Sequence, residues 1–451
     1  MEAFYNCVVW LNGYLWGWPM IILLMGTHLY LTFRLRFVQR FIGKAIKLSV
    51  TKEEGAEGDV SPFGALTTAL AATIGTGNIV GVATAVALGG PGAVLWLWLT
   101  GVFGIATKYS EAVLSVKYRV KTSDGTMLGG PMYALEKGLK MKWLAVFFCI
   151  FTAIAAFGIG NMVQANSISS MTKETVNVPT WVSGLIMAVL TAVVILGGVK
   201  SISHVCEMLV PFMAVFYVLG CLTILAINHV YIIPAMEIIF KHAFTAKAAG
   251  GGFAGATVLM AARYGVARGL FSNESGLGSA PIVAAAAQTR NPVRQALVSS
   301  TGTFWDTVVI CAITGLVLVS SIIRNPAGLD GLKGAALTKA AFAQIPVVGP
   351  IVLNIGLLTF VFSTILGWSY YGERAIEYLF GKIAIMPYRL LWVIAVFFGS
   401  VATLPLVWEL ADSMNALMAI PNLISIILLN GVLVAETRKY LWEGKLDDIG
   451  N

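Results

Sequence analysis

The sequence predicts an all-α membrane protein in which eleven transmembrane helices include a five-plus-five inverted-repeat core. The chain has 451 residues, of which 58% are hydrophobic and only 12% are charged. A soluble domain carries about 25% charged residues, so this chain cannot cover itself with polar surface. Eleven apolar runs approach the roughly 20 residues that cross a bilayer. Two of these runs are interrupted by glycine-rich polar segments at matching places in the two halves.

The apolar runs follow one another along the whole chain. The predicted spans are 7–32, 62–87, 93–116, 143–167, 180–199, 205–227, 253–286, 297–323, 347–371, 387–407 and 412–435. The first run is too long for a cleaved signal and follows Met1-Glu2 without a basic segment, so we expect it to remain as an extra helix. The predicted divisions are an extra helix and linker (1–61), a first repeat (62–228), an extracellular connection (229–252), a second repeat (253–435) and a tail (436–451).

Basic residues orient these spans. Loop 33–61 carries six Lys and Arg residues, which the positive-inside rule assigns to the cytoplasm. The N-terminus then lies outside and the C-terminus inside, as expected for a multi-pass protein of the plasma membrane. The basic residues left outside are Lys173, Lys241, Lys247, Arg324, Lys333 and Lys339. The outer stretch 229–250 is amphipathic and forms either an interfacial helix or a plain loop.

The second span is interrupted at its centre. Residues 71–83 read Ala-Ala-Thr-Ile-Gly-Thr-Gly-Asn-Ile-Val-Gly-Val-Ala. Gly75 and Gly77 let the backbone unwind and let a ligand approach without a Cβ in the way. A broken helix offers N–H groups to a carboxylate at one end and carbonyls to an ammonium or sodium ion at the other. A dinucleotide loop is disfavoured because no strand precedes the glycines, whereas close helix packing remains an alternative.

The seventh span contains a second interruption. Residues 271–278 read Phe-Ser-Asn-Glu-Ser-Gly-Leu-Gly. A run this polar at bilayer depth must face protein or a wet cavity. Each interrupted span opens a block of five spans, and because five is odd the second block starts from the opposite side of the membrane. This pattern predicts an inverted repeat with a binding site at the paired breaks, and the two charges of a small amino acid suit such a break.

The motifs around the breaks resemble those of the alanine or glycine:cation symporters, the sodium:alanine symporter family. The motifs are Gly75-x-Gly77-Asn78-Ile79-x-Gly81-Val82-Ala83, Gly89-Gly90-Pro91-Gly92-Ala93, Gly160-Asn161-Met162-Val163-Gln164-Ala165-Asn166 and Ser272-Asn273-Glu274-Ser275-Gly276-Leu277-Gly278-Ser279-Ala280-Pro281. The resemblance covers nearly the whole chain. It implies an importer of alanine or glycine that is coupled to sodium or protons and has the five-plus-five fold of many amino-acid/sodium symporters.

The first break is also similar to the unwound helix of the neurotransmitter:sodium symporters, and this likeness implies roles for single residues. The unwound segment would be Gly75-Thr76-Gly77-Asn78. In it the N–H groups of Gly75, Thr76 and Gly77 would bind the substrate carboxylate. The carbonyls of Thr73, Phe271 and Ser272 would bind the ammonium group. Two further candidates are Gln164, whose alternative is an interhelical hydrogen bond, and Trp368, whose alternative is packing.

The same likeness implies a sodium site between spans two and nine. The carbonyls of Ala71 and Ile74 would bind the ion together with the hydroxyls of Ser363 and Thr364. These two hydroxyls are adjacent at the middle of span nine, and oxygen ligands suit a hard cation. Their alternative role is hydrogen bonding back to their own helix.

Ionisable side chains inside spans are functional candidates. We expect Glu274 to form an ion pair with Arg263 or Arg268, with proton coupling or gating as its alternative role. Asp306 is a candidate cation ligand, and its alternative role is a polar contact near the cytoplasmic half of span eight.

Several other functional classes are disfavoured. The sequence has no Ser-His-Asp set, metal-binding His/Glu spacing or Walker loop, which disfavours an enzyme. Five cysteines and four histidines are dispersed, which disfavours a disulfide or metal site. A channel is disfavoured because a channel filter is usually built by oligomeric rings. Binding to nucleic acid is disfavoured because the basic residues lie in particular loops. We therefore predict sodium-coupled import of alanine or glycine with no organic cofactor and with the lipid bilayer as partner. Proton coupling, or exchange of another small neutral amino acid, is the alternative.

Overall fold

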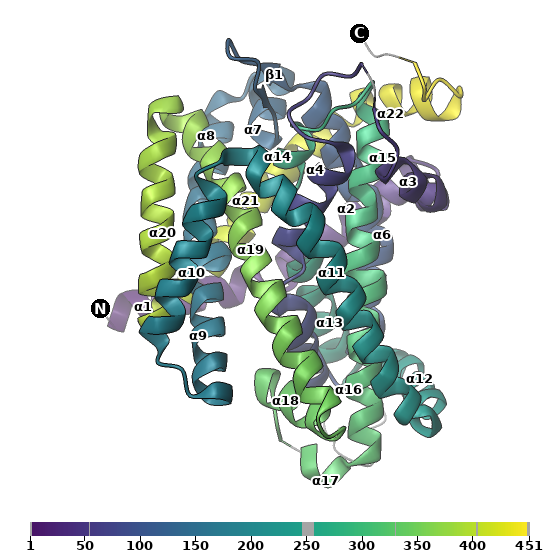
Figure 1. Cartoon of the computed structure of the whole chain (residues 1–451). Helices are drawn as coiled ribbons and strands as arrows, with labels where there is room; N and C mark the ends of the chain where they lie inside the picture. The colour runs from purple at the N-terminus through teal and green to yellow at the C-terminus, as the bar shows by residue number, and fades with distance from the viewer. Residues whose placement is uncertain (1, 54, 246–256, 330, 403–404, 449–451) are drawn as a thin grey trace.

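The structure, a computed structural model, describes residues 2–53, 55–245, 257–329, 331–402 and 405–448. Long helices run side by side between two ends of the molecule (Figure 1). Helix α3 (Ile42–Ser49) and helix α22 (Asn430–Thr437) lie at one end, which we call the tail side. Helix α18 (Gly334–Ala343) lies at the opposite end, which we call the α18 side.

The remaining elements follow one another along the two halves of the chain. The first half contains α1 (Glu2–Leu15), α2 (Trp18–Arg34), η1 (Val38–Phe41), α4 (Pro62–Thr73), η2 (Gly77–Gly81), α5 (Val82–Gly89), α6 (Ala93–Lys117), β1 (Val120–Lys121), β2 (Met127–Leu128), α7 (Pro131–Tyr133), η3 (Ala134–Gly138), α8 (Lys142–Ala155), η4 (Ala156–Met162), α9 (Val163–Val176), α10 (Thr180–Ile195) and α11 (Gly198–Ile227). The second half contains α12 (His229–Phe244), α13 (Val258–Asn273), α14 (Pro281–Ala284), α15 (Pro292–Thr303), η5 (Phe304–Cys311), α16 (Ala312–Arg324), α17 (Pro326–Leu329), α19 (Val348–Phe380), η6 (Lys382–Ala384), α20 (Ile385–Val401), α21 (Pro405–Leu428) and η7 (Arg438–Trp442). Strands β1 and β2 form a short antiparallel hairpin on the tail side.

The helices agree with a protein that crosses a membrane several times. Among the described residues, seven helical stretches are long and apolar enough to cross a bilayer, or eight when the bent pair between residues 62 and 89 counts as one. Helices α6, α10 and α13 lie in three further predicted spans but are not in that set. The predicted count of eleven therefore stays a prediction.

The outer surface is suited to lipid. Helices α10, α11 and α20 expose large apolar side chains, among them Val193 at 72%, Leu219 at 58% and Leu391 at 57% exposure. Exposed apolar surface of this extent marks contact with lipid or another protein. Helices α11 and α19 pack closely at Gly220, where an added Cβ would collide with the side chain of Val352.

The first predicted span contains two helices. Helices α1 and α2 are separated by a turn at Trp16 and Gly17. A Cβ at Gly17 would lie 2.9 Å from the carbonyl oxygen of Tyr14, so the turn requires glycine. Pro19 then stands in the first turn of α2, where its missing N–H costs nothing.

Within the amphipathic stretch 229–250, residues His229–Phe244 form helix α12 on the α18 side. This confirms the helix and not the loop for residues 229–244. Residues 246–250, the basic residue Lys247 and the predicted start of span seven at 253 lie outside the described residues, as do residues 403–404 of span ten and residues 449–451 of the predicted tail.

Candidate functional site

The predicted break in the second span is confirmed. Helix α4 begins after Ser61, whose hydroxyl accepts from the N–H of Gly64 at 2.8 Å, and it ends at Thr73. Ile74 has an extended backbone with ψ of 95°. The two half-helices on either side of this point are bent by 54° relative to each other. The C-terminal carbonyls of α4 and the first N–H groups of the next half-helix therefore meet in the interior.

Asn78 holds the first break open. Its Oδ1 accepts from the N–H of Gly75 at 2.8 Å, so the carboxylate of a ligand would not find that donor free. The N–H groups of Thr76 and Gly77 donate to no residue in the described part of the chain. They lie at the N-terminal end of a half-helix, where the helix dipole favours an anion. The first break thus presents two free donors.

The predicted break in the seventh span is also confirmed. Helix α13 ends at Asn273, and Glu274, Gly276 and Gly278 follow with positive φ values of 54°, 93° and 89°. Phe271 and Ser272 are thus still helical, in the last turn of α13 rather than in the unwound segment.

A carboxylate from another helix binds the second break. The N–H groups of Gly276 and Gly278 each donate to Oε1 of Glu111 on α6 at 3.0 Å. Asn422 on α21 donates to the same oxygen at 2.6 Å and to the carbonyl of Gly276 at 2.9 Å. In a continuous helix the N–H of Gly276 would bond to the carbonyl of Ser272. The bond to Glu111 leaves that carbonyl available to a ligand.

The same reasoning applies to the preceding carbonyl. The N–H of Ser275 donates to the side chain of Asn273 at 2.9 Å and not to the carbonyl of Phe271. The second break therefore offers acceptors where the first break offers donors.

Four oxygens meet where α4 ends beside α19. The hydroxyl of Ser363 lies 3.2 Å from the carbonyl oxygen of Ala71, and the hydroxyl of Thr364 lies 3.4 Å from that of Ile74. Both hydroxyls also donate to the carbonyl of Phe360, at 2.8 and 2.9 Å. Bonding back to their own helix and facing the break, which sequence reasoning treated as alternatives, occur together.

Asp306 connects the two breaks. It is fully buried in η5, near the middle of the long helix 292–324, and not near its tail-side end. Its Oδ1 accepts from Asn78 of the first break at 2.6 Å, and its Oδ2 accepts from Ser272 of the second at 3.1 Å and from Thr307 at 2.6 Å. This carboxyl thus accepts hydrogen bonds from side chains of both breaks.

The expected ion pair of Glu274 with an arginine is wrong. Glu274 accepts instead from the hydroxyl of Ser279 at 2.5 Å and from the indole of Trp368 at 3.2 Å. Arg263 lies over the ring of Tyr264, and Arg268 lies over the ring of Phe271. Glu274 therefore contacts Trp368 on α19, far away along the chain, and not an arginine of the preceding helix.

The two remaining candidates are both buried. Trp368 is fully buried, and besides Glu274 it packs against Gly160 so closely that a Cβ at Gly160 would collide with the Cβ of Trp368. Gln164 donates to the carbonyl of Ile159 in its own helix at 2.9 Å, so the interhelical bond is wrong. The Oε1 of Gln164 is buried without a partner among the described residues.

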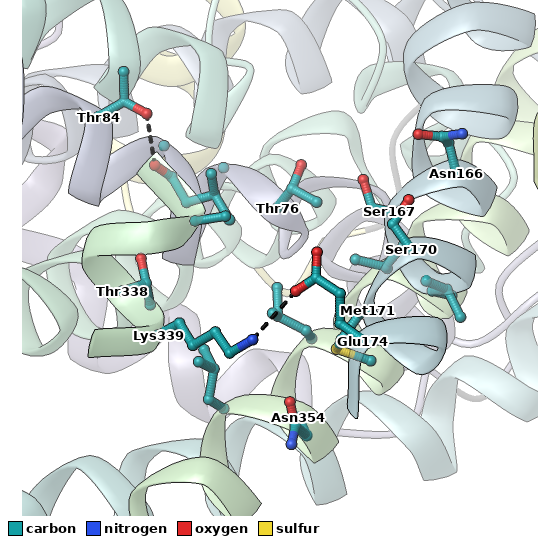
Figure 2. Close-up of a pocket in the computed structure, with 18 of the residues that line it drawn as sticks. Thr76, Thr84, Asn166, Ser167, Ser170, Met171, Glu174, Thr338, Lys339 and Asn354 are labelled. Atoms are coloured by element: carbon teal, nitrogen blue, oxygen red, sulfur yellow. Dashed lines mark hydrogen bonds and ion pairs between the residues drawn. The ribbon is translucent and has the colours of Figure 1, made fainter. Parts of the chain in front are cut away.

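A cavity leads from the α18 side to the first break. It has a volume of about 460 Å³ and is lined by Thr76 and Gly77 at the first break and by Phe271 in the last turn of α13, before the second break. Figure 2 shows its walls, with residues 166–174 of α9 on one side and Thr84, Thr338 and Lys339 on the other. Near its mouth Lys339 forms an ion pair with Glu174 at 3.2 Å.

The tail side is closed by polar contacts. Arg119 donates to the carbonyls of Ala285, Ala287 and Glu57 at 2.9 to 3.2 Å. The N–H of Asp59 donates to the carbonyl of Ala286 at 2.7 Å. Further along, Arg294 pairs with Glu53 at 2.5 Å and with Asp447 of the tail, and Asn291 donates to the carbonyls of Leu446 and Asp448 at 2.8 and 2.9 Å. The first break is therefore reached from the α18 side, whereas these contacts hold segments of the tail side together.

Sequence reasoning missed Lys108, Glu111 and Asn422. All three are buried beside the second break. A signal was present, because Lys108 and Glu111 are ionisable residues inside the predicted span 93–116 and such residues are rarely passive.

Comparisons with known proteins agree on the kind of protein. Residues 1–448 match the model of the sodium:alanine symporter family. The chain is 53% identical to the sodium/alanine symporter AgcS of Methanococcus maripaludis, covering 97% of each chain. It is 37% identical to the probable sodium/glutamine symporter GlnT of Bacillus subtilis, covering 96% of this chain and 90% of the other.

A likeness to a solved structure concerns the fold alone. The crystal structure of MhsT in complex with L-phenylalanine matches with a TM-score of 0.56 at 14% identity, and the match covers 84% of this chain and 98% of that chain.

Proposed function

Because this chain belongs to the sodium:alanine symporter family, we propose that it imports alanine or glycine together with sodium by alternating access. Like its named relatives, it is a transporter and not an enzyme. The observation that carries the coupling is the meeting of four oxygens from the end of α4 and the middle of α19. Carbonyl and hydroxyl oxygens are the ligands that sodium, a hard cation, prefers.

The residues fit a zwitterionic substrate at the same place. The free N–H groups of Thr76 and Gly77 bind the carboxylate, and the cavity brings the substrate to them. Gly75 and Asn78 shape this donor end through their mutual hydrogen bond. The carbonyls of Thr73, Phe271 and Ser272 bind the ammonium group, since they lie at the negative ends of α4 and α13.

Gln164 and Trp368 act beside this site. The unpartnered Oε1 of Gln164 is an acceptor for the ammonium group. Trp368 closes the wall between α19 and the second break through its bond to Glu274.

Sodium binds to Ala71, Ile74, Ser363 and Thr364. The ion sits at the C-terminal end of α4, whose dipole attracts it. It thereby stiffens the break that holds the substrate, so each ligand raises the affinity for the other. Asp306 is a second cation ligand, supported by its place between Asn78 and Ser272.

The topology proposed for the chain has eleven spans, with the N-terminus outside and the C-terminus in the cytoplasm of the cell. Residues 62–228 and 253–435 form the inverted repeats, and the segments 1–61, 229–252 and 436–451 lie outside them. Support comes from the two breaks, each of which opens a block of five predicted spans. The cavity on the α18 side then faces outward.

The test is uptake of labelled alanine into proteoliposomes under an inward sodium gradient or an inward proton gradient. Thr364→Ala removes a ligand oxygen, whereas the control Thr364→Ser keeps it. Sodium-driven accumulation that weakens in Thr364→Ala but not in Thr364→Ser supports the proposal. Uptake driven only by protons would move coupling to Glu274 or Asp306. No concentrative uptake would mean another substrate, or a protein that exchanges or senses.

A further inference from the structure

Lys108 is a buried cation without a partner. It is 3% exposed, and its Nζ makes no hydrogen bond in the described part of the chain. The buried arginines of the described residues, Arg294 and Arg374, each contact at least one carboxylate within 4 Å. Lys108 also lies well inside α6, nine residues before its end at Lys117. A charge kept at this depth without a contact partner calls for a functional reason.

Two helix ends face Lys108. A cavity of about 10 Å³ beside it is lined by Thr73 and Asn273, the last residues of α4 and α13, and by Ser299 of α15. This space holds about one water molecule. The C-terminal end of a helix carries partial negative charge. Lys108 is therefore stabilised by the ends of both half-helices that lead into the two breaks.

Lys108 and Ser363, which is one of the proposed sodium ligands, lie against opposite faces of α4. Ala69 and Thr73 line the cavity with Lys108, whereas Ala71 faces Ser363 on α19. At 100° per residue, Ala71 is turned by about 200° from both Ala69 and Thr73. The same negative helix end thus faces a fixed ammonium group on one side and a ligand proposed for sodium on the other.

The charge of Lys108 also reaches the carboxyl groups of both breaks. It acts electrostatically on Glu111 and Glu274 at the second break and on Asp306 between the breaks, without contacting any of them. When sodium leaves, Lys108 is the cation that remains beside these groups among the described residues.

We propose that Lys108 is the internal counter-cation of the transport cycle, which compensates the negative end of α4 and the buried carboxylates while the transporter returns without sodium. This inference rests on the sodium-coupled function proposed above. Net uptake requires the empty return, whereas exchange of labelled for unlabelled alanine, with sodium on both sides, does not. Lys108 acts on the return step by compensating the negative charge of neighbouring groups. It is therefore a positioning residue.

The test compares net uptake with exchange for the same proteoliposomes. Lys108→Gln and Lys108→Met should lower sodium-driven net uptake at least tenfold and leave exchange within twofold. Lys108→Arg keeps the charge and should restore the wild-type ratio of net uptake to exchange. The matched control is Lys137→Gln, which removes an exposed lysine and should leave the ratio unchanged. Equal loss of both activities, or a lowered ratio in Lys108→Arg, would overturn the inference.

Sodium binding at equilibrium gives a second readout that does not require transport. Removing a competing positive charge should tighten sodium binding to Lys108→Gln by roughly three- to tenfold. Unchanged or weaker binding would contradict the inference. The failure of the proposed function is distinguishable, because it would appear in the wild type as absence of sodium-driven alanine uptake.

Discussion

Alanine at position 75 should weaken sodium coupling without unfolding the protein. A Cβ at Gly75 would lie 2.7 Å from the hydroxyl oxygen of Thr364, and its next neighbours are 3.8 Å away or more. The φ angle of Gly75 is outside the left-handed region, so the alanine backbone fits. The methyl group therefore meets one atom, and that atom is a ligand proposed for sodium.

The size of the effect follows from this single contact. Ordinary van der Waals contact begins at 3.4 Å, so the hydroxyl of Thr364 must retreat by about 0.7 Å. Overpacking of this kind costs about 1–3 kcal/mol. A factor of ten in affinity corresponds to about 1.4 kcal/mol, so the KM for sodium should rise roughly 5- to 150-fold.

The assay is alanine uptake into proteoliposomes at increasing external sodium. Gly81→Ala is the matched control in the same segment, because its Cβ would meet nothing closer than 3.9 Å. It should leave the KM for sodium within about twofold. The reasoning would be refuted if Gly75→Ala kept the sodium dependence of Gly81→Ala, or if only the KM for alanine changed.

Three further outcomes are expected. Glu111→Ala leaves two buried N–H groups without an acceptor and should lower the free energy of unfolding by about 2–6 kcal/mol. Glu111→Gln keeps an accepting oxygen and should lose less, so equal falls in melting temperature would contradict this. Glu53→Gln removes the buried carboxylate that pairs with Arg294 and leaves this arginine its exposed partner Asp447, so it should cost about 1.5–3 kcal/mol by the same assay, whereas Asp447→Asn, at an 83% exposed side chain, should cost far less. Lys339→Gln breaks a pair whose side chains are 65% and 66% exposed, and it should change the KM for alanine less than about twofold in uptake assays.

The two breaks could be predicted because their signals are local. Glycine and asparagine in an apolar run make a continuous helix unfavourable whatever surrounds it. The place where α13 ends was less predictable, since Glu111 from another helix accepts the N–H groups that would close the next turn, and Asn422 donates to the same carboxylate. The number of spans also resists prediction where α6 and α13 carry polar residues that only their neighbours satisfy.

The site residues differ in the same way: some have a local signal in the sequence, and others have partners far away along the chain. Ser363 and Thr364 were identified by chemistry and likeness, and the structure brings them to Ala71 and Ile74. The partner of Glu274 was not predictable in this way. Six residues at 100° each turn Arg268 by about 240° away from it, and eleven residues put Arg263 about 16 Å along the axis. Trp368, which does bond to Glu274, lies 94 residues later in the chain.

Arginines, carbonyls and carboxylates supply the contacts described above that hold the tail side closed. A closure made of apolar side chains would expose apolar surface to water on opening, and the hydrophobic effect would favour the closed state. Each of these polar contacts can instead be exchanged for contacts with water at little net cost, because water replaces both partners. Wetting of this face is then enough to loosen it, and its opening should be fast and sensitive to salt.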